Sequence, residues 1–161
     1  MAVDAFLMLD GIKGESVDKE HAGEIDVLAW SWGMSQSGTM HMSTGGGAGK
    51  ANVQDLSFTH FLDSSSPNLM KMCCNGKHIP KAVLTCRSAG ENPLEYLVIT
   101  MEQVMVTSVS LGGSGGEDRF TENFTLNFAD VVVEYQPQSG TGAKEGGVIE
   151  FTGNIAENIY A

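Results

Sequence analysis

The side chains of this chain that could do chemistry are three cysteines and four histidines. A glycine-rich stretch is a further candidate. A thiol beside an imidazole can act as a nucleophile with its general base. A glycine run that ends in lysine can wrap the phosphates of a nucleotide. The sequence therefore offers two chemistries to weigh, a thiol at Cys73, Cys74 or Cys86 and a phosphate site between Gly45 and Lys50.

The glycine-rich stretch does not match a phosphate-binding loop. Thr44 occupies the position of the first glycine, and Ala51 follows Lys50 where such loops carry serine or threonine. No helical pattern follows the lysine. The composition is instead typical of a flexible connection. We expect residues 39–52 to form a projecting glycine-rich hairpin loop and not a nucleotide site.

The thiols and imidazoles do not form a recognisable catalytic or metal-binding pattern. Cys73 and Cys74 fall on the apolar stripe of a predicted helix and Cys86 lies in an apolar strand, where buried cysteine behaves as a small hydrophobic residue. His60 shares an apolar strand face with Phe58 and is interpreted as a core histidine. No histidine pair has the i, i+4 spacing of a metal site. We expect the protein to have no enzymatic activity and to bind no cofactor and no metal. An exposed thiol of low pKa would instead favour an enzyme.

Length and charge narrow the function classes. The chain has 161 residues, 42% of them hydrophobic, and a net charge of −11. These values favour one folded domain over residues 1–161. The acidic balance excludes nucleic acid and anionic membranes as partners, because both require basic residues. The sequence opens without the basic start of a Sec signal peptide and holds no run of 18 apolar residues, so we expect it to fold in a reducing cytoplasm.

The basic residues gather in one segment. Residues 64–90 carry four bases and no acid, a net charge of +4, which leaves −15 on the remainder. One interpretation is a solvated helix face. The other is self-assembly, in which opposite charges align neighbouring subunits head to tail. The candidate subunit-contact charges are the bases Lys71, Lys77, Lys81 and Arg87 and the acids Glu15, Asp18 and Glu20.

Strand patterns dominate the elements that would position these side chains. Alternating or apolar runs predict strands at residues 2–9, 25–37, 55–62, 82–87, 94–111, 119–136 and 148–155. In the second of these, the large side chains expected to face the core are Leu28, Trp30, Trp32 and Met34. The small side chains on its other face are Ser31, Gly33 and Ser35.

The 119–136 segment predicts a bend within a strand. Its apolar residues occupy even positions up to Phe128 and odd positions from Val131 onwards. Because side chains alternate between the two faces of a sheet, this change predicts a β-bulge or sharp bend near residues 128–131. A long bent strand is what a barrel or an orthogonal sandwich needs to turn a corner.

One helix is predicted over about residues 66–76. Ser66 can cap it, Pro67 suits its first turn, and Gly76 suits the position just past its end. Its apolar stripe consists of Leu69, Met70, Cys73 and Cys74. The predicted fold class is mainly β, a small β-barrel or orthogonal sandwich with one short flanking α-helix.

Several stretches together resemble the haemolysin-coregulated protein (Hcp) family. The opening resemblance covers residues 6–16, His21, residues 24–27 and the pair Trp32-Gly33. Residues 63–67, Asp-Ser-Ser-Ser-Pro, are similar to the family's approach to its helix. Residues 122–129, continuing to Val133-Glu134-Tyr135, resemble its late strand. The similarity runs essentially from end to end and is weakest at the glycine-rich residues 43–51.

The resemblance implies a structural protein. Hcp proteins are β-barrels with one helix that form hexameric rings, and the rings stack into the inner tube of the bacterial type VI secretion system. A sheath surrounds this tube, a spike protein tips it, and contraction expels it with effectors that the ring lumen can hold. The implied partners are therefore further copies of the chain, small effector proteins, and the sheath and spike. The implied location is the bacterial cytoplasm before firing and the medium afterwards, with no enzymatic activity.

Within that family picture, two segments become candidate sites. We expect Ser31, Gly33 and Ser35 to line or border the lumen. We expect the loop to contact the next ring through Ser43, Gly45, Gly46, Gly47, Gly49 and Lys50. The alternative is a stand-alone secreted binding or effector-chaperone protein without a tube role, which the native mass would separate from a ring.

Overall fold

The structure is a computed structural model that describes residues 3–38 and 50–161. Most of the predicted ring-stacking loop, namely Ser43, Gly45, Gly46, Gly47 and Gly49, lies outside the described residues. Lys50, the last residue of that set, is described and exposed.

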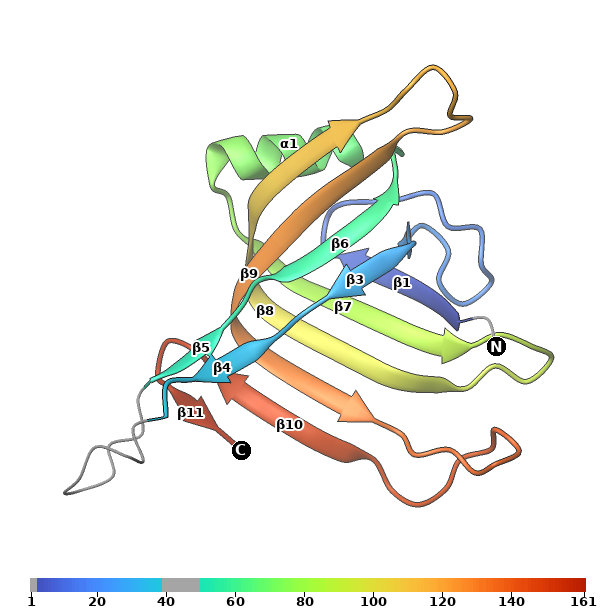
Figure 1. Ribbon diagram of the computed structural model, residues 1–161, viewed down its shortest axis with the longest axis vertical. Coiled ribbons are helices and arrows are strands. Elements are labelled where there is room, and N and C mark those ends of the chain that lie inside the picture. The colour runs from blue at the N-terminus through green and yellow to red at the C-terminus, as the bar shows by residue number, and fades with distance from the viewer. Residues whose placement is uncertain (1–2, 39–49) are drawn as a thin grey trace.

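The described residues form eleven strands and one helix (Figure 1). The first six strands are β1 (Val3–Leu9), β2 (Ile25–Val27), β3 (Ala29–Ser31), β4 (Met34–Gln36), β5 (Ala51–Val53) and β6 (Leu56–Phe61). Then follow α1 (Ser66–Asn75), β7 (Ile79–Ser88), β8 (Glu95–Gly112), β9 (Thr121–Tyr135), β10 (Ile149–Asn154) and β11 (Ile159–Tyr160). Within this part of the chain, no helix has the length and apolar character needed to cross a membrane.

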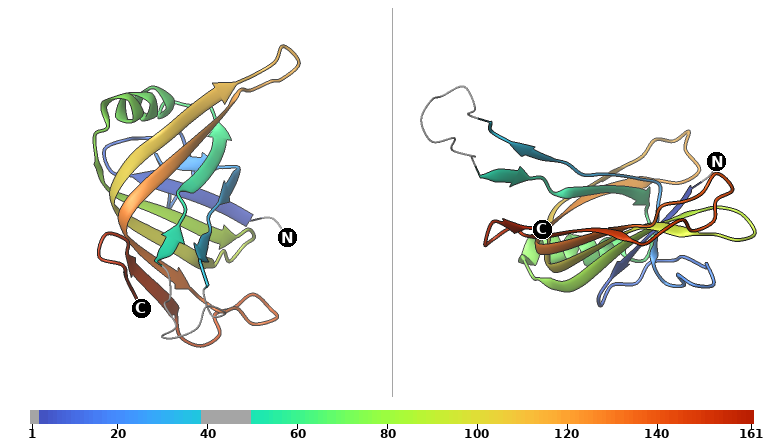
Figure 2. Two further views of the ribbon diagram at one scale, coloured as in Figure 1. Left: turned by 60° about the vertical axis from the view of Figure 1, so that its left-hand side comes forward. Right: turned by 90° about the horizontal axis from the view of Figure 1, so that it is seen from below.

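Nine of the strands belong to one antiparallel sheet. Its order is β11-β10-β9-β8-β7-β1-β2, and β6 pairs with both β9 and β3. The sheet folds over so that β3 and β6 face β1, β7 and β8 (Figures 1 and 2). The predicted mainly β class is confirmed, and of its two predicted forms the sandwich is the better description. The sheet does not close into a regular barrel; at Leu28 the chain passes from β2, which pairs with β1, to β3, which pairs with β6.

The long strand β9 turns the corner between the two layers. Its first half pairs with β6 and its second half with β10, while β8 accompanies it throughout. Its buried positions change from even to odd between Phe128 and Val131, as predicted. The register irregularity, however, lies in β8, between Val106 and Ser108. Gln103 of β8, opposite Ala129, also has a φ of 53°, so the partner strand absorbs the distortion of the bend.

The helix forms where the sequence predicts it, with two differences in detail. Gly76 ends it in the left-handed conformation, with φ of 64°, and its N–H donates to the Met72 carbonyl. The N-cap is Ser65 and not Ser66; the Ser66 hydroxyl accepts a hydrogen bond from the Asp63 N–H. Of the predicted stripe Leu69 is fully buried, but Cys74 is exposed, because ten residues of helix present only a narrow face to the sheet.

The core lies between the two layers of the folded sheet. Phe58 of β6 and Phe124 of β9 are its largest fully buried side chains, and their rings stack at 5.2 Å between centroids. The predicted core face of residues 28–34 is only half right. Trp30 and Trp32 pack against the core, whereas Leu28 and Met34 are about half exposed. Leu28 lies where the chain passes from β2 to β3, and Met34 begins the separate β4–β5 pair.

Candidate functional site

A face of small polar side chains covers one side of β3, β6, β9 and β8. Residues directly opposite each other in paired strands share a face. The register gives one row of Ser31, Ser57, Thr125 and Ser108, and a second row of Ala29, Thr59, Asn123 and Ser110. We call these eight residues the polar face. The positions between the two rows hold Trp30, Phe58, Phe124 and Val109, which point to the core.

Hydrogen bonds between side chains hold the polar face together. Thr59 donates to Asn123 at 2.5 Å, and the hydroxyls of Ser108 and Thr125 lie 2.6 Å apart. At the border of the face, Asp55 accepts hydrogen bonds from Thr107 at 2.6 Å and from Asn127 at 2.9 Å. The polar face itself contains no charged residue among these eight described positions. Such a surface offers many weak donors and acceptors and no fixed charge to select one particular ligand.

The predicted lumen row Ser31, Gly33 and Ser35 is divided between two places. Ser31 belongs to the polar face and is exposed. Gly33 lies in the link between β3 and β4, where its carbonyl accepts a hydrogen bond from the Gln54 N–H at 2.9 Å. Ser35 lies on β4, opposite Asn52 of β5. The alternation of side chains in the sequence therefore predicted the exposed position of Ser31. It did not predict that Ser31, Gly33 and Ser35 fail to form one surface, because the chain passes from β3 to the separate strand β4 between them.

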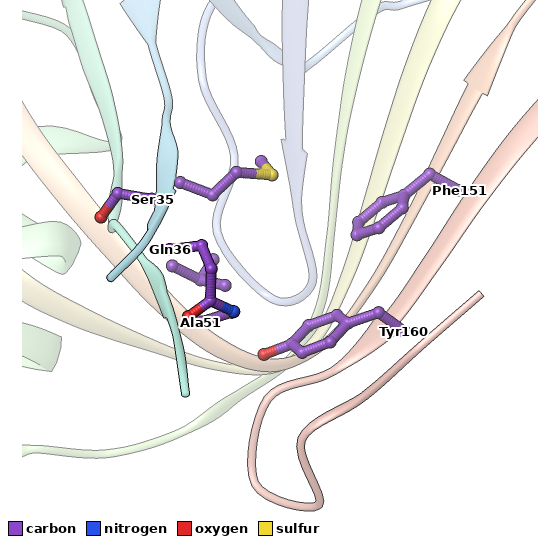
Figure 3. A pocket seen from close by; sticks show the side chains of 7 residues that line it. Ser35, Gln36, Ala51, Phe151 and Tyr160 are labelled. Carbon is purple, nitrogen blue, oxygen red and sulfur yellow. The ribbon is translucent and has the colours of Figure 1, made fainter. Parts of the chain in front are cut away.

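Ser35 borders an apolar pocket between the β4–β5 pair and the C-terminal strands. Phe151 of β10 and Tyr160 of β11 form its far wall with stacked rings, 6.2 Å apart (Figure 3). The cavity is about 260 Å³, and its remaining lining residues are Met34, Gln36, Ala51 and Val53. The sequence analysis missed this pocket because nothing in residues 34–53 indicates contact with a segment a hundred positions away.

The candidate subunit-contact charges separate into two groups. Lys71, Lys77 and Lys81 are exposed. Arg87, by contrast, is buried and hydrogen bonds through both terminal nitrogens to Asp18 of the same chain, with Glu20 at 4.0 Å. Arg87 lowers the pKa of Asp18 through this hydrogen bond, against the effect of burial. One more of the candidate acids makes a contact within the chain.

That contact involves Glu15, which accepts a hydrogen bond from the Ser64 N–H at 2.8 Å. Arg87, Asp18, Glu20 and Glu15 therefore have partners within the chain, and their predicted role between subunits stays a prediction. The spacing in sequence, 69 positions between Asp18 and Arg87, hid the partnership. Lys71, Lys77 and Lys81 have exposed side chains, and their role between subunits also stays a prediction.

Two histidines are each placed between two carboxylates. His60 is buried, as predicted for a core histidine; its Nε2 lies 2.7 Å from Glu122 and its Nδ1 3.8 Å from Asp63. Burial by itself lowers the pKa of His60, but these two acids outweigh it and leave the pKa raised. His21 lies between Glu24 and Glu95. Sequence reasoning missed both arrangements, although each histidine has an acid three residues later.

The thiols show no arrangement for catalysis in the described part of the chain. Burial raises the pKa of the Cys86 thiol, which makes it a poorer nucleophile. Cys73 is half-buried and Cys74 is exposed on α1. Glu20, His21 and Glu95 come within 4.8 Å of one another, but both ring nitrogens of His21 already face carboxylates, so we assign these residues to an ion-pair cluster.

Comparison with known proteins decides the family. The family model for the type VI secretion system effector Hcp matches residues 6–135. The chain belongs to the Hcp family. It is 65% identical to Protein hcp1 of Pseudomonas aeruginosa, over 100% of both chains. The Hcp resemblance seen in the sequence is thereby confirmed.

Solved structures of Hcp proteins have the same fold. The crystal structure of Hcp1 from Salmonella typhimurium has a TM-score of 0.83 and 42% identity, covering 100% of both chains. A type VI secretion system effector from Yersinia pestis has a TM-score of 0.77 and 37% identity, covering 94% of this chain and 99% of that one. Hcp is a family of secreted structural proteins of the type VI system.

Proposed function

We propose that this Hcp chain is the structural subunit of the type VI inner tube. Copies form hexameric rings, the rings stack, and sheath contraction expels them with effectors carried or protected in the lumen. The observation that carries the proposal is the polar face on a member of the Hcp family. A wall of small neutral side chains lets a folded cargo protein lie against it through hydrogen bonds and water, without a charge that must be neutralised.

The partners follow from the same proposal. They are other copies of the chain, small effector proteins, and the sheath and spike of the apparatus. The protein resides in the bacterial cytoplasm before firing and outside the cell afterwards. Contact between rings falls to the loop of residues 39–52, a role that rests on the sequence and on the exposure of Lys50 at its described end.

Exposed apolar residues at the C-terminal side of the sheet support self-assembly. Tyr135 of β9 and Ile149 of β10 are directly opposite each other, with exposed fractions of 45% and 63%. Val148, which precedes Ile149 in the chain, is also more than half exposed. Neighbouring apolar side chains left in water are typical of a protein-protein contact. We assign Tyr135, Val148 and Ile149 to the contact between subunits, with Lys71, Lys77 and Lys81 as its charged complement.

The native mass tests the proposal directly. We expect native mass spectrometry of the untagged protein to show a species of six 17.1 kDa chains. A stable single chain at low micromolar concentration would contradict the ring and favour the stand-alone secreted binding protein.

A substitution on the polar face tests the lumen role. Ser31→Trp places a large side chain on an exposed position of this face. We expect the variant to form rings of unchanged mass. The amount of a small effector protein that elutes with these rings in size exclusion should fall by a factor of about ten or more, which corresponds to a loss of about 1.4 kcal/mol in binding free energy. Ser114→Trp, in the exposed connection between β8 and β9, is the matched control. Equal retention of the effector by both variants would show that the polar face does not line the lumen.

A further inference from the structure

The connection between β1 and β2 lies over the sheet as a strap, which we define as residues 13–24. Its two ends are joined by backbone hydrogen bonds, from the Gly14 N–H to the Gly23 carbonyl at 2.8 Å and from the Ser16 N–H to the Glu24 carbonyl at 2.9 Å. Gly14 is required for this closure, because a Cβ there would lie 2.6 Å from the Glu24 carbonyl oxygen. The strap has no regular secondary structure, so its attachment depends on side chains.

Two cations attach the strap to the sheet. Arg87 of β7 holds Asp18 through two hydrogen bonds, and Asp4 of β1 and Glu20 of the strap lie within 4.0 Å of its guanidinium group. His21, in the strap itself, reaches in the other direction to Glu95, the first residue of β8, at 2.8 Å. The Phe6 ring of β1 contacts both cations.

Phe6 places both cations in fixed positions. The His21 ring stacks on it with centroids 4.6 Å apart and an angle of 7°, and the Arg87 guanidinium carbon lies 4.9 Å from its centroid. Aromatic stacking and cation–π contact both favour positive charge beside the ring. The imidazole therefore cannot swing away from its carboxylates without losing this stack.

The geometry of His21 requires a proton on each ring nitrogen. Its Nδ1 lies 3.0 Å from both oxygens of Glu24, and its Nε2 lies 2.8 Å from Glu95. Ionised carboxylates only accept hydrogen bonds, and a neutral imidazole has a single N–H. Only the imidazolium form can donate to both acids, and loss of one proton to water leaves a nitrogen lone pair facing a carboxylate.

We propose that His21 is a proton-dependent clasp that fastens the strap to β8, beside the permanent Arg87–Asp18 attachment. When His21 is protonated, the strap is held by both cations, in addition to the hydrogen bond between Glu15 and the Ser64 N–H. When it is neutral, the contact with Glu95 or that with Glu24 is lost, while Arg87 continues to hold Asp18. The strap then opens at its Glu24 end, where it leads into β2. This device does not depend on ring assembly.

The direction of the pH effect follows from the charges. Burial alone lowers the pKa of His21, but Glu95 and Glu24 outweigh it, and the pKa is raised above its usual value near 6.5. A group with a raised pKa in the folded state contributes its full stabilisation below its unfolded pKa and loses it as the pH rises through the folded pKa. The strap should therefore loosen on the alkaline side of about pH 6.5.

Two measurements on the full chain test the clasp. In ¹⁵N-labelled protein we expect both ring nitrogens of His21 to carry protons at pH 6.5. In hydrogen–deuterium exchange we expect the protection of peptides within residues 13–24, corrected for the intrinsic exchange rate, to fall about tenfold between pH 6 and pH 9. This is the scale of one lost charge-assisted hydrogen bond. Peptides from the β8–β9 core should keep their protection.

Three variants complete the test. Glu95→Gln should lower strap protection about tenfold at pH 6, and His21→Gln should make it independent of pH. His78→Gln, which changes an exposed histidine, should behave as the wild type. A His21 ring with a single proton at pH 6.5, or a strap whose protection falls with pH in His21→Gln as it does in the wild type, would overturn the proposal. The wild-type titration alone suffices if a variant fails to fold.

Discussion

Ile149→Glu is expected to convert the ring into single 17.1 kDa chains that remain folded. Ile149 is the most exposed apolar residue of β10 and lies opposite Tyr135, in the surface that we assign to subunit contact. A carboxylate buried there without a partner costs several kcal/mol. Association should weaken more than about a hundredfold, which native mass spectrometry or analytical ultracentrifugation would show.

The matched control is Val17→Glu. Val17 is 96% exposed, in the strap and away from β10, so the same chemical change there should leave the ring mass unaltered. Far-ultraviolet circular dichroism establishes that both variants are folded. Intact rings of Ile149→Glu would show that this surface does not hold subunits together.

Phe124→Ala should lower the free energy of unfolding by about 3–5 kcal/mol. Phe124 is fully buried, stacks on Phe58, and meets the edge of His60 with ring centroids 5.3 Å apart. Removing its ring leaves a cavity between the two layers and strips the packing from the His60 pair. Total stabilities of single domains are 5–15 kcal/mol, so the variant loses a large share. Urea titration at fixed chain concentration measures the effect.

Ser110→Ala is the control for this substitution. It lies on the exposed polar face, opposite Asn123, the residue before Phe124. We expect a change within about 0.5 kcal/mol. Similar losses for both variants would mean that the interior of the folded sheet is not where the stability of the chain resides.

The alternating strands were the part of the fold that the sequence could predict best. Residues 119–136 predicted both the core face and the change of face near 128–131, because alternation of side chains is a local property of a strand. Alternation does not say how far a strand stays in the sheet. Met34 shares a pattern with Trp30 and Trp32 but ends up exposed, because it belongs to the separate β4–β5 pair; Leu28 is exposed where the chain passes from β2 to β3.

The candidate site was predictable only where one strand carries it. Ser31 could be placed on a small polar row, but the rest of the polar face comes from β6, β8 and β9, and register between strands is a tertiary property. The partners of charged residues were even harder to predict from the sequence. Arg87 and Asp18 were expected on opposite sides of a subunit contact, and they bind each other. Composition shows an excess of charge, but not which charges neutralise one another in the fold.

The change of partners along β9 also sets the order in which the chain can fold. The β8–β9 hairpin closes a connection of only eight residues, 113–120, whereas β6 is separated from β9 by the helix and two long strands. Short closures cost less chain entropy, so the hairpin can form first and serve as a template on which β6 and β10 assemble separately. Phe124→Ala should then slow refolding, whereas truncations in β10 should mainly speed unfolding. One bent hairpin would thus be the nucleus of both layers.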